Sequence, residues 1–256
     1  MKYDPIKDQL FSLVRLFPTF RALFYKMLDF LLLRQRYVKR EIRRYFHDGD
    51  SFYDAGAGFC QYSDFVLKRY PKSRVFATDL KTDYLSSYAS LAGKRFSFKT
   101  ADLQNYEPQN KFDLAIAIDI LEHIEDDCAA ITNLYNTLKD GAHLIISTPS
   151  NLDEAARYAE EHVRPGYDKE ELEAKLIACG FEIISSRYSY GAFGALAWKL
   201  QMQIPLAMLD ATKFNALVLL LWYPMFMPLM EFLVRLDMMK QNRRGNGIIL
   251  VARKRL

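Results

Sequence analysis

The sequence SFYDAGAGFC, residues 51–60, decides the fold of this chain. A β-prone run ends in Asp54, two glycines follow at once, and residues 62–70 are compatible with a helix. α/β proteins use this order of strand, glycine turn and helix to cradle nucleotide-like ligands. Glycine lets backbone N–H groups approach such a ligand with no Cβ in the way. A glycine turn alone does not identify a ligand-binding loop, so the spacing of the segments that follow it must be considered as well.

Outward from this turn, β-prone segments alternate with helix-compatible ones. Strands are expected at residues 51–55, 74–79, 96–100, 112–119, 142–147, 181–188 and 247–253. Apolar residues at helical spacing precede the fifth strand, and residues 139–141 are expected to form a turn before it. The alternation predicts an α/β fold with a parallel, doubly wound, Rossmann-like sheet of seven strands.

The flanking segments predict three parts of the chain. Residues 1–46 are expected to form N-terminal amphipathic helices, separated into two by Pro18. Residues 47–188 and 247–256 would form the ligand-binding domain. Residues 189–246 are far longer than a hairpin turn needs and are rich in Met, Trp and Leu. They predict a hydrophobic helical insertion or lid between strands six and seven.

Composition narrows the class of protein. The 256 residues are 50% hydrophobic, which permits a sizeable core. The three cysteines are scattered, without metal-ligand spacing or a disulfide framework, so we expect no metal and a reducing cytoplasm. No cleavable signal peptide is expected. The net charge of +4 is modest, but six arginines and lysines stand against one acid in residues 34–44.

At this point the chain resembles the class I S-adenosylmethionine-dependent methyltransferases, of the bacterial small-molecule type similar to methyltransferase type 11 and 12 members. The resemblance covers roughly residues 45–188 and 247–253. The family's D-x-G-x-G-x-G loop is matched by Asp54, Gly56, Ala57 and Gly58. Cys60 replaces the third glycine, at a position that mostly serves close helix packing.

The resemblance implies S-adenosyl-L-methionine as the cofactor and assigns its other contacts. Asp79 matches the ribose-binding acid, because a carboxylate can accept both ribose hydroxyls, and Leu80 lies beside it. Asp102 stands where the family binds the adenine amino group, with Leu103 beside it. The segment after strand four, next to the methionine moiety and the substrate, begins with Asp119 and Ile120. Taken singly, these glycines and acids could be turn residues and helix caps.

Two histidines are candidate general bases for an oxygen acceptor, since the protein supplies mainly proximity, alignment and a base. His123 follows strand four, and His162 lies in the stretch EHVRPGY, residues 161–167. In that stretch Arg164 would hold an anionic substrate group. Tyr158 and Tyr167 would line the same mouth. The alternatives are that His162 and Arg164 brace the loop, and that His123 positions the loop on the cofactor side.

The insertion points to a large hydrophobic acceptor. Residues 214–230 are almost wholly apolar, fall just short of a membrane span and are interrupted by Pro224 and Pro228. A lid over an apolar pocket, or a hairpin in the membrane interface next to the basic stretch, fits better than a span. Packing of both regions as a helical cap or homodimer interface is the alternative. Expected acceptors are a lipid, a prenylated or polyketide-type phenol, or a lipid-linked intermediate, reached from the cytoplasm or the inner membrane face.

Two rival functions remain open. The basic stretch encourages nucleic-acid methylation, yet Asp119-Ile120-Leu121-Glu122 stands where an N/D-P-P-Y/F segment would be, so no nucleic-acid partner is expected. A non-catalytic S-adenosylmethionine-binding scaffold is the other rival, because intact cofactor acids do not prove turnover. A dinucleotide-dependent dehydrogenase is disfavoured, since the glycine triplet is incomplete and no Tyr-x-x-x-Lys follows strand five.

Overall fold

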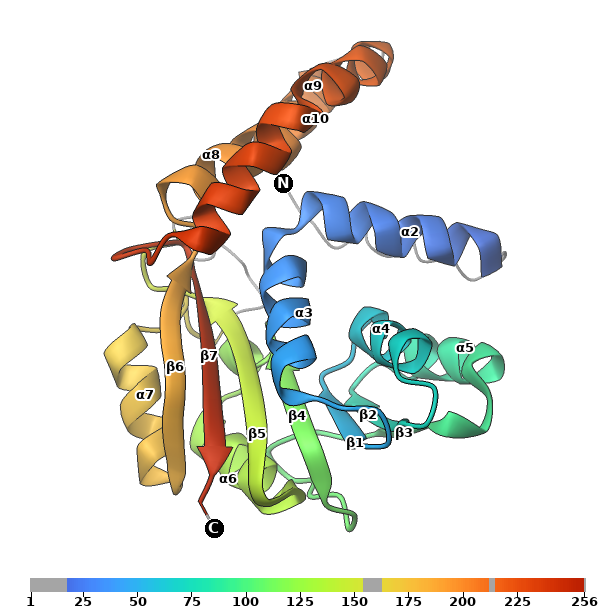
Figure 1. The fold of residues 1–256 in the computed structure, drawn as a ribbon, viewed down its shortest axis with the longest axis vertical. Coiled ribbons are helices and arrows are strands. Elements are labelled where there is room, and N and C mark those ends of the chain that lie inside the picture. The colour runs from blue at the N-terminus through green and yellow to red at the C-terminus, as the bar shows by residue number, and fades with distance from the viewer. Residues whose placement is uncertain (1–17, 154–162, 212–214, 256) are drawn as a thin grey trace.

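The computed structural model describes residues 18–153, 163–211 and 215–255. One sheet holds seven strands in the order β3-β2-β1-β4-β5-β7-β6 (Figure 1). Their bounds are β1 Ser51–Ala55, β2 Arg74–Asp79, β3 Phe96–Thr100, β4 Phe112–Ile118, β5 Leu138–Pro149, β6 Phe181–Ser189 and β7 Gly247–Lys254. The predicted α/β fold, with helices before the sheet and a helical insertion between strands six and seven, is confirmed.

Helices cover both faces of the sheet, and alternate residues of each strand feed the two core layers. Phe52 and Ile116 pack with α3, α4 and α5 on one face, whereas Tyr53 and Ala115 pack with α6 and α7 on the other. The helices are α2 Pro18–Leu31, α3 Leu33–Tyr45, α4 Gln61–Arg69, α5 Thr82–Ala92, η1 Gly93–Arg95, η2 Leu121–His123, α6 Asp127–Thr137 and α7 Lys169–Ala178. The insertion adds α8 Ala192–Trp198, the π-helix η4 Lys199–Gln203, α9 Ile204–Ala211 and α10 Asn215–Met239.

The expectation of an all-parallel sheet is wrong for the last strand. β7 pairs antiparallel with both β5 and β6. The chain leaves β6 at the carboxyl edge, traverses the insertion and re-enters at the same edge, so β7 must run the opposite way. The predicted turn at residues 139–141 is instead part of β5. There the pairing with β4 shifts from Phe112↔Leu138 to Leu114↔His143, which leaves these residues in a bulge.

The N-terminal helices divide at a different place from the one predicted. Pro18 is the first residue of α2, where proline is well tolerated, and the predicted helix before it lies outside the described residues. The division between α2 and α3 is at Leu32, whose φ of −112° and ψ of 103° are extended. The two helices pack on different partners: α2 packs on Phe59 of the glycine loop, and α3 packs on the sheet. The bend therefore follows from tertiary packing.

The expectation that two prolines interrupt the apolar segment is also wrong. α10 runs through Pro224 and Pro228 as a helix of 25 residues. Neighbouring contacts hold it, because Trp222 Nε1 donates to the Leu200 carbonyl and Tyr223 Oη to the Gln201 carbonyl, both at 3.0 Å. Those carbonyls belong to η4, where the π-helical spacing disturbs the regular ladder. The result is a helical hairpin that projects beyond the sheet (Figure 1).

By length and composition alone, residues Val218–Met239 of α10 could cross a membrane. A single helix of this kind is weak evidence, because core helices of soluble proteins pass the same test. Only 22% of the apolar window is buried, however, so this is not a core helix. Its second half is anchored by the buried Met230, Leu233 and Val234, whereas no residue from 218 to 229 is buried.

Candidate functional site

The glycine turn connects β1 to α4 at the carboxyl edge of the parallel strands. Gly56 has a φ of +74°, and a Cβ there would lie 2.7 Å from Cγ1 of Ile120. Glycine is therefore required by both the backbone and the packing of the loop after β4. Gly58 has a φ of +49°, and a Cβ on it would meet nothing within 4 Å. Its backbone faces open space, as a loop that cradles a ligand requires. Ala57, between them, is buried.

Cys60 has a second role that the sequence did not reveal. It is fully buried, as a packing role predicts, and it also adopts a left-handed φ of 58° as the N-cap of α4. This backbone conformation costs an L-residue about 1–2 kcal/mol. The third glycine of the family's loop would avoid that cost. The position therefore demands an unusual backbone as well as a small side chain.

The Asp54 carboxylate holds the loop from beneath. It is 2% exposed and accepts hydrogen bonds from Ser63, from N at 3.2 Å and from Oγ at 2.6 Å. Burial raises the pKa of Asp54 to about 7, although the two hydrogen bonds from Ser63 act in the other direction. Asp54 thus fastens β1 to α4. Its predicted role toward the cofactor would be exerted through the loop.

Asp79 ends β2 and is fastened to the same loop. Its Oδ2 accepts a hydrogen bond from Gly58 N at 2.8 Å, and its Oδ1 accepts one from Lys81 N at 2.9 Å. Leu80 beside it is 68% exposed, so an apolar side chain lies at the surface next to the acid. The structure therefore brings the glycine loop, Asp79 and Leu80 together.

Asp102 and Leu103 follow β3 along the same edge. Asp102 Oδ1 accepts a hydrogen bond from Gln104 N at 3.0 Å, which makes a tight local turn. Leu103 is buried in the core, and its carbonyl accepts a hydrogen bond from Asn133. Asp102 lies at the predicted edge, while the Leu103 side chain serves packing.

The loop after β4 is constrained on both sides. Asp119 has a φ of +49°, and its N donates to the Ser147 carbonyl at 2.7 Å. Its carboxylate forms an ion pair with Arg34 of α3. Ile120 covers Gly56, as described above. This arrangement places Asp119 and Ile120 beside the glycine loop, where the sequence expects the methionine end of the cofactor.

Glu122 and His123 lie on η2 in the same loop. Glu122 is buried and accepts a hydrogen bond from Thr148 Oγ1 at 3.1 Å. Burial raises the pKa of Glu122, and a hydrogen bond from its own backbone N–H acts in the other direction. His123 is partly exposed, and its backbone N donates to the Ile120 carbonyl at 3.1 Å. Of the two predicted bases, His123 is the one that the structure describes.

The predicted substrate residues after β5 are occupied by structural contacts. The Arg164 guanidinium donates to the carbonyls of Leu121, Ile124 and Glu125 at 2.7–2.9 Å. Tyr167 is buried, and its hydroxyl donates to Asp127 Oδ2 at 2.7 Å. These contacts favour the alternative in which Arg164 braces the loop, and Tyr167 does the same. Their substrate roles stay predictions. His162 and Tyr158 lie outside the described residues.

Sequence reasoning missed a polar cluster at the amino ends of α3 and α4. Arg34 N donates to Tyr190 Oη at 3.2 Å, in addition to the ion pair with Asp119. Three buried polar atoms at this place have no hydrogen-bond partner among the described residues: Gln35 Oε1, Gln61 Oε1 and Tyr62 Oη. Buried polar atoms are normally paired, so these are positions that a polar ligand would satisfy. The sequence carries no signal for the cluster, because its members come from widely separated segments.

No group of three His, Cys, Asp or Glu side chains within residues 18–153, 163–211 and 215–255 is placed to hold a metal ion. The polar groups of the site are instead arranged around a glycine loop at the carboxyl edge. Ligands of open α/β sheets bind at this edge, where the strand order reverses between β1 and β4.

A model of the methyltransferase domain family matches residues 34–186, from the start of α3 into β6. This chain belongs to that family. The resemblance inferred from the loop and the acids is thereby confirmed. The matched range begins at Arg34, so the family domain includes the helix that holds Asp119, and it ends before the insertion.

Curated relatives resemble this methyltransferase-domain protein at low identity. Malonyl-[acyl-carrier protein] O-methyltransferase 1 of Ilyobacter polytropus is 25% identical over 122 residues, 46% of each chain. Trans-aconitate 2-methyltransferase of Agrobacterium fabrum is 27% identical over 114 residues, 44% of each chain. The chain thus matches just under half the length of these relatives.

Solved structures share the fold of this methyltransferase-domain protein. The [4+2]-cyclase SpnF aligns with a TM-score of 0.60 and 19% identity, over 86% of this chain and 80% of the cyclase. Phosphoethanolamine N-methyltransferase 2 of Haemonchus contortus, in complex with S-adenosyl-L-methionine, aligns with a TM-score of 0.59 and 18% identity, over 84% and 51%. At such identities the likeness shows the fold alone.

Proposed function

We propose that this protein transfers the methyl group of S-adenosylmethionine to an oxygen atom of a hydrophobic small molecule. The observation that carries the proposal is the joined unit of glycine loop and Asp79 at the carboxyl edge, within a methyltransferase-family domain. The enzyme would work from the cytoplasm, at the inner face of the membrane.

The residues at this edge fit the cofactor. Each Asp79 oxygen accepts one backbone N–H, and a carboxylate has about four acceptor sites, so capacity remains for two ribose hydroxyls. The exposed Leu80 offers an apolar surface to the adenine ring, with Asp102 at its edge. The unpaired Gln61 and Tyr62 atoms lie just beyond the glycine loop, where they would meet the polar methionine end. When bound, the cofactor supplies a methyl group already activated on a sulfonium.

The chain's own contribution to transfer would be alignment and proton removal. The Arg34–Asp119 ion pair and the packing of Ile120 on Gly56 fix the loop beside the methyl position. His123, on η2 in that loop, would accept the proton of an acceptor hydroxyl. His162 stays an alternative base. An O-methyltransferase among the relatives supports transfer to oxygen.

The insertion supports a hydrophobic acceptor. Eight apolar residues of α10 are exposed by 40% or more: Val218, Leu220, Leu221, Met225, Met227, Leu229, Phe232 and Met239. α10 reaches the site through its buried Asp237, which binds Tyr37 of α3. An acceptor held against α10 would therefore lie on the side of α3 from which Arg34 reaches the candidate site.

Incubation with methyl-labelled cofactor and a cell lipid extract tests this function. The expected result is label in the organic phase, released as intact methylated product. A Tyr62→Phe variant should fold normally, since it removes only an unpaired hydroxyl, and should bind cofactor or turn over more weakly. Label in nucleic acid would instead establish nucleic-acid methylation, the rival function.

The second candidate function is cofactor binding without methyl transfer. The cyclase SpnF supports it, because the same fold there belongs to a protein named for another reaction. Calorimetry of cofactor binding, followed by the methyl-transfer assay, separates the two. Cofactor binding without methyl transfer to lipid, phenol or carboxylate acceptors would favour a non-methylating role. Absence of cofactor binding would contradict both.

A further inference from the structure

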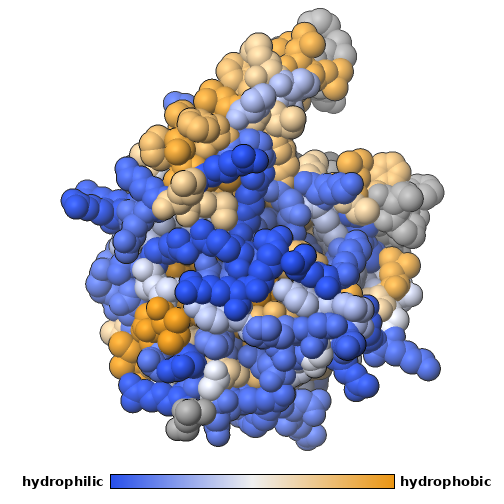
Figure 2. Space-filling view, viewed as in Figure 1, coloured by the Kyte–Doolittle hydropathy of each residue, from blue (hydrophilic) through white to orange (hydrophobic). Residues whose placement is uncertain are grey.

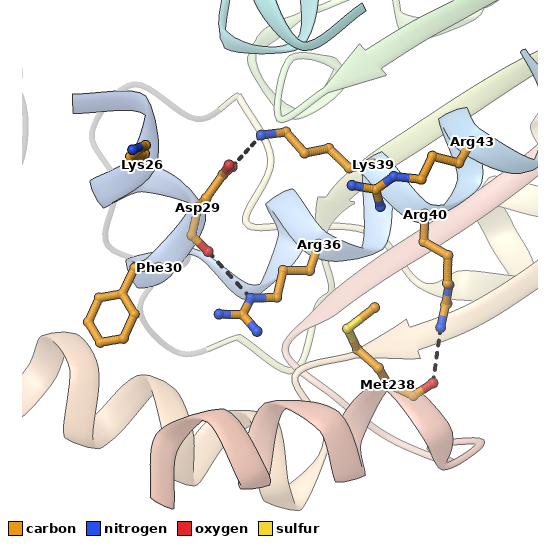
Figure 3. Close-up of a pocket in the computed structure, with 8 residues that line it drawn as sticks. All are labelled: Lys26, Asp29, Phe30, Arg36, Lys39, Arg40, Arg43 and Met238. Carbon is orange, nitrogen blue, oxygen red and sulfur yellow. Dashed lines mark hydrogen bonds and ion pairs between the residues drawn. The ribbon is translucent and has the colours of Figure 1, made fainter. Parts of the chain in front are cut away.

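A basic groove lies between α2, α3 and the end of α10, outside the candidate methyl-transfer site. Its volume is about 560 Å³. Figure 3 shows that its side chains come from all three helices and gather around the bend between α2 and α3. Five of the lining residues are cationic and one is acidic: Lys26, Arg36, Lys39, Arg40 and Arg43 against Asp29.

Two of these cations are neutralised within the protein. Lys39 forms an ion pair with Asp29, and Arg36 forms a two-pronged ion pair with Glu231 of α10. These pairs fasten α2 and α10 to α3. They also consume the one acid in the lining. Of the remaining cations, Arg40 pairs through Nε with Glu41, a residue outside the lining, at 3.1 Å.

The other three cations keep unused donors. Arg40 Nη1 donates to the Met238 carbonyl at 3.1 Å, but Nη2 is buried with no hydrogen-bond partner in the described part of the chain. Arg43 is exposed, and its guanidinium lies over the Phe65 ring at 5.0 Å. Lys26 is exposed and forms no ion pair with another described residue. A guanidinium pair and an ammonium with free donors are suited to a phosphate group.

The apolar surface beside the groove indicates where that phosphate would come from. Figure 2 shows the α9–α10 hairpin as a hydrophobic projection above a largely hydrophilic body. α2, which forms one wall of the groove, also exposes Phe20 and Leu23. Apolar side chains and cations at one end of a molecule match the acyl and phosphate layers of an anionic membrane.

We propose that this groove binds the phosphate of an anionic phospholipid headgroup while the exposed apolar residues of α10 enter the same leaflet. The inference extends the membrane part of the proposed function. A second copy packed groove to groove would bring the same cations together, and like charges would repel.

The two prolines of α10 limit how deep the hairpin goes. Each lacks an N–H, so the carbonyls of Leu220 and Pro224 lose their helical donors. Pro224 and Pro228 are both exposed. Unpaired carbonyls are costly in hydrocarbon but are satisfied by water at headgroup level. The hairpin therefore lies in the interface, which keeps the basic groove at its base within reach of the phosphates.

Vesicle sedimentation of the full chain tests the proposal without cofactor or acceptor, so it can fail independently of methyl transfer. The vesicles contain phosphatidylcholine alone or with phosphatidylglycerol. We expect wild-type protein to bind the anionic vesicles more tightly. Lys26→Ala/Arg43→Ala should weaken that binding roughly 10- to 30-fold, at about fivefold per cation. Leu221→Gln/Met225→Gln should weaken binding to both vesicle types.

Lys94→Ala/Arg255→Ala is the matched control, because it removes the same charge from exposed residues at the opposite edge of the sheet. It should bind like the wild type. Thermal unfolding by circular dichroism should show all variants folded. The proposal is overturned if the groove variant keeps its preference for anionic vesicles, or if inorganic phosphate at equal phosphorus concentration abolishes binding. A dimer in light scattering that dissociates with the hairpin variant would also overturn it.

Discussion

Single carboxylates of this site differ in role, although they look alike in the sequence. Asp79 is bonded to backbone N–H groups at the edge of β2, where it retains acceptor capacity. Asp54 is enclosed and bonded to Ser63, so it acts on the protein alone. Position at a strand end therefore does not by itself make an acid a ligand contact; burial decides between the two roles.

Asp79→Asn should weaken S-adenosylmethionine binding about tenfold or more, because charge-assisted hydrogen bonds are worth about 1.5–3 kcal/mol each. The amide retains the shape and one acceptor, so the loop should stay folded. Isothermal calorimetry measures the effect. Asp83→Asn, an exposed acid in the first turn of α5, is the control and should bind like the wild type. An Asp79→Asn affinity within about twofold of wild type would contradict the ribose assignment.

The pKa of Asp54 predicts a specific pH dependence of stability. Burial raises the pKa of Asp54 to about 7, whereas an unfolded aspartate has a pKa of about 3.9. Between these values the folded state holds the extra proton, so stability falls as pH rises from about 4 to about 7. The loss is on the order of 4 kcal/mol. Asp54→Asn should flatten this dependence in urea unfolding followed at several pH values, while Asp83→Asn should not.

Much of the site was predictable residue by residue, because the glycines and strand-end acids occur at fixed spacing. Asp79, Asp102 and Asp119 all lie at the expected edge. The Arg34–Asp119 pair was not predictable, since it joins residues 85 positions apart across a tertiary contact. Nor was the bracing by Arg164, because a sequence shows a cation but not the carbonyls that surround it.

At the scale of elements, one buried carboxylate fastens the insertion to the domain. Asp237 of α10 is fully buried and accepts hydrogen bonds from Tyr37 Oη and Gly194 N, both at 3.0 Å, and from Asn242 Nδ2 at 3.2 Å. These donors lie on α3, on α8 and before β7. A Cβ on Gly194 would approach Asp237 Oδ2 to 2.7 Å, so glycine permits the close approach.

Asp237→Ala should destabilise the protein by about 2–5 kcal/mol, because Gly194 N loses its buried acceptor and Tyr37 Oη and Asn242 Nδ2 each lose one of two acceptors. Urea unfolding followed by circular dichroism measures the loss. Asp237→Asn keeps an acceptor for Gly194 and should cost less, which keeps the test informative if the alanine variant does not fold. Asp140→Ala removes a carboxylate that is 71% exposed and should change stability little. Equal losses of stability at both positions would contradict the role of Asp237 in fastening α10 to the domain.

Elements with a clear hydrophobic period were predicted well, and their boundaries less well. The strands emerged from alternating segments because the buried sheet demands continuous β-prone runs. The bend at Leu32 has no glycine or proline to announce it. Local propensity disfavours a helix through two prolines, yet α10 is continuous. Contacts with η4 and α8 hold it in the helical conformation. In both cases tertiary packing overrides the local signal.

For the whole molecule, the structure separates a sheet domain from a projecting hairpin, and under the proposed function the first would hold the cofactor and the second the acceptor. The hairpin can be shortened where its two arms touch, at Gln201 and Tyr223. Replacement of residues 202–222 by a short Gly–Ser loop should leave cofactor affinity within about twofold of wild type. The KM for an apolar acceptor should rise about tenfold, with less than proportional change in kcat. Steady-state kinetics on a lipid or phenol acceptor compares the shortened protein with the wild type. An unchanged KM would contradict a role of the hairpin in acceptor binding.

The pairing of β6 with β7 has a consequence for how such proteins diversify. Ser189 pairs with Gly247, so the two ends of the insertion emerge side by side from neighbouring strands. A segment attached at adjacent points can be lengthened, shortened or exchanged at small entropic cost, because loop closure grows only slowly with length. The sheet can then stay unchanged while the insertion varies. Under the proposed function, evolution could change the acceptor without changing the residues that bind the cofactor.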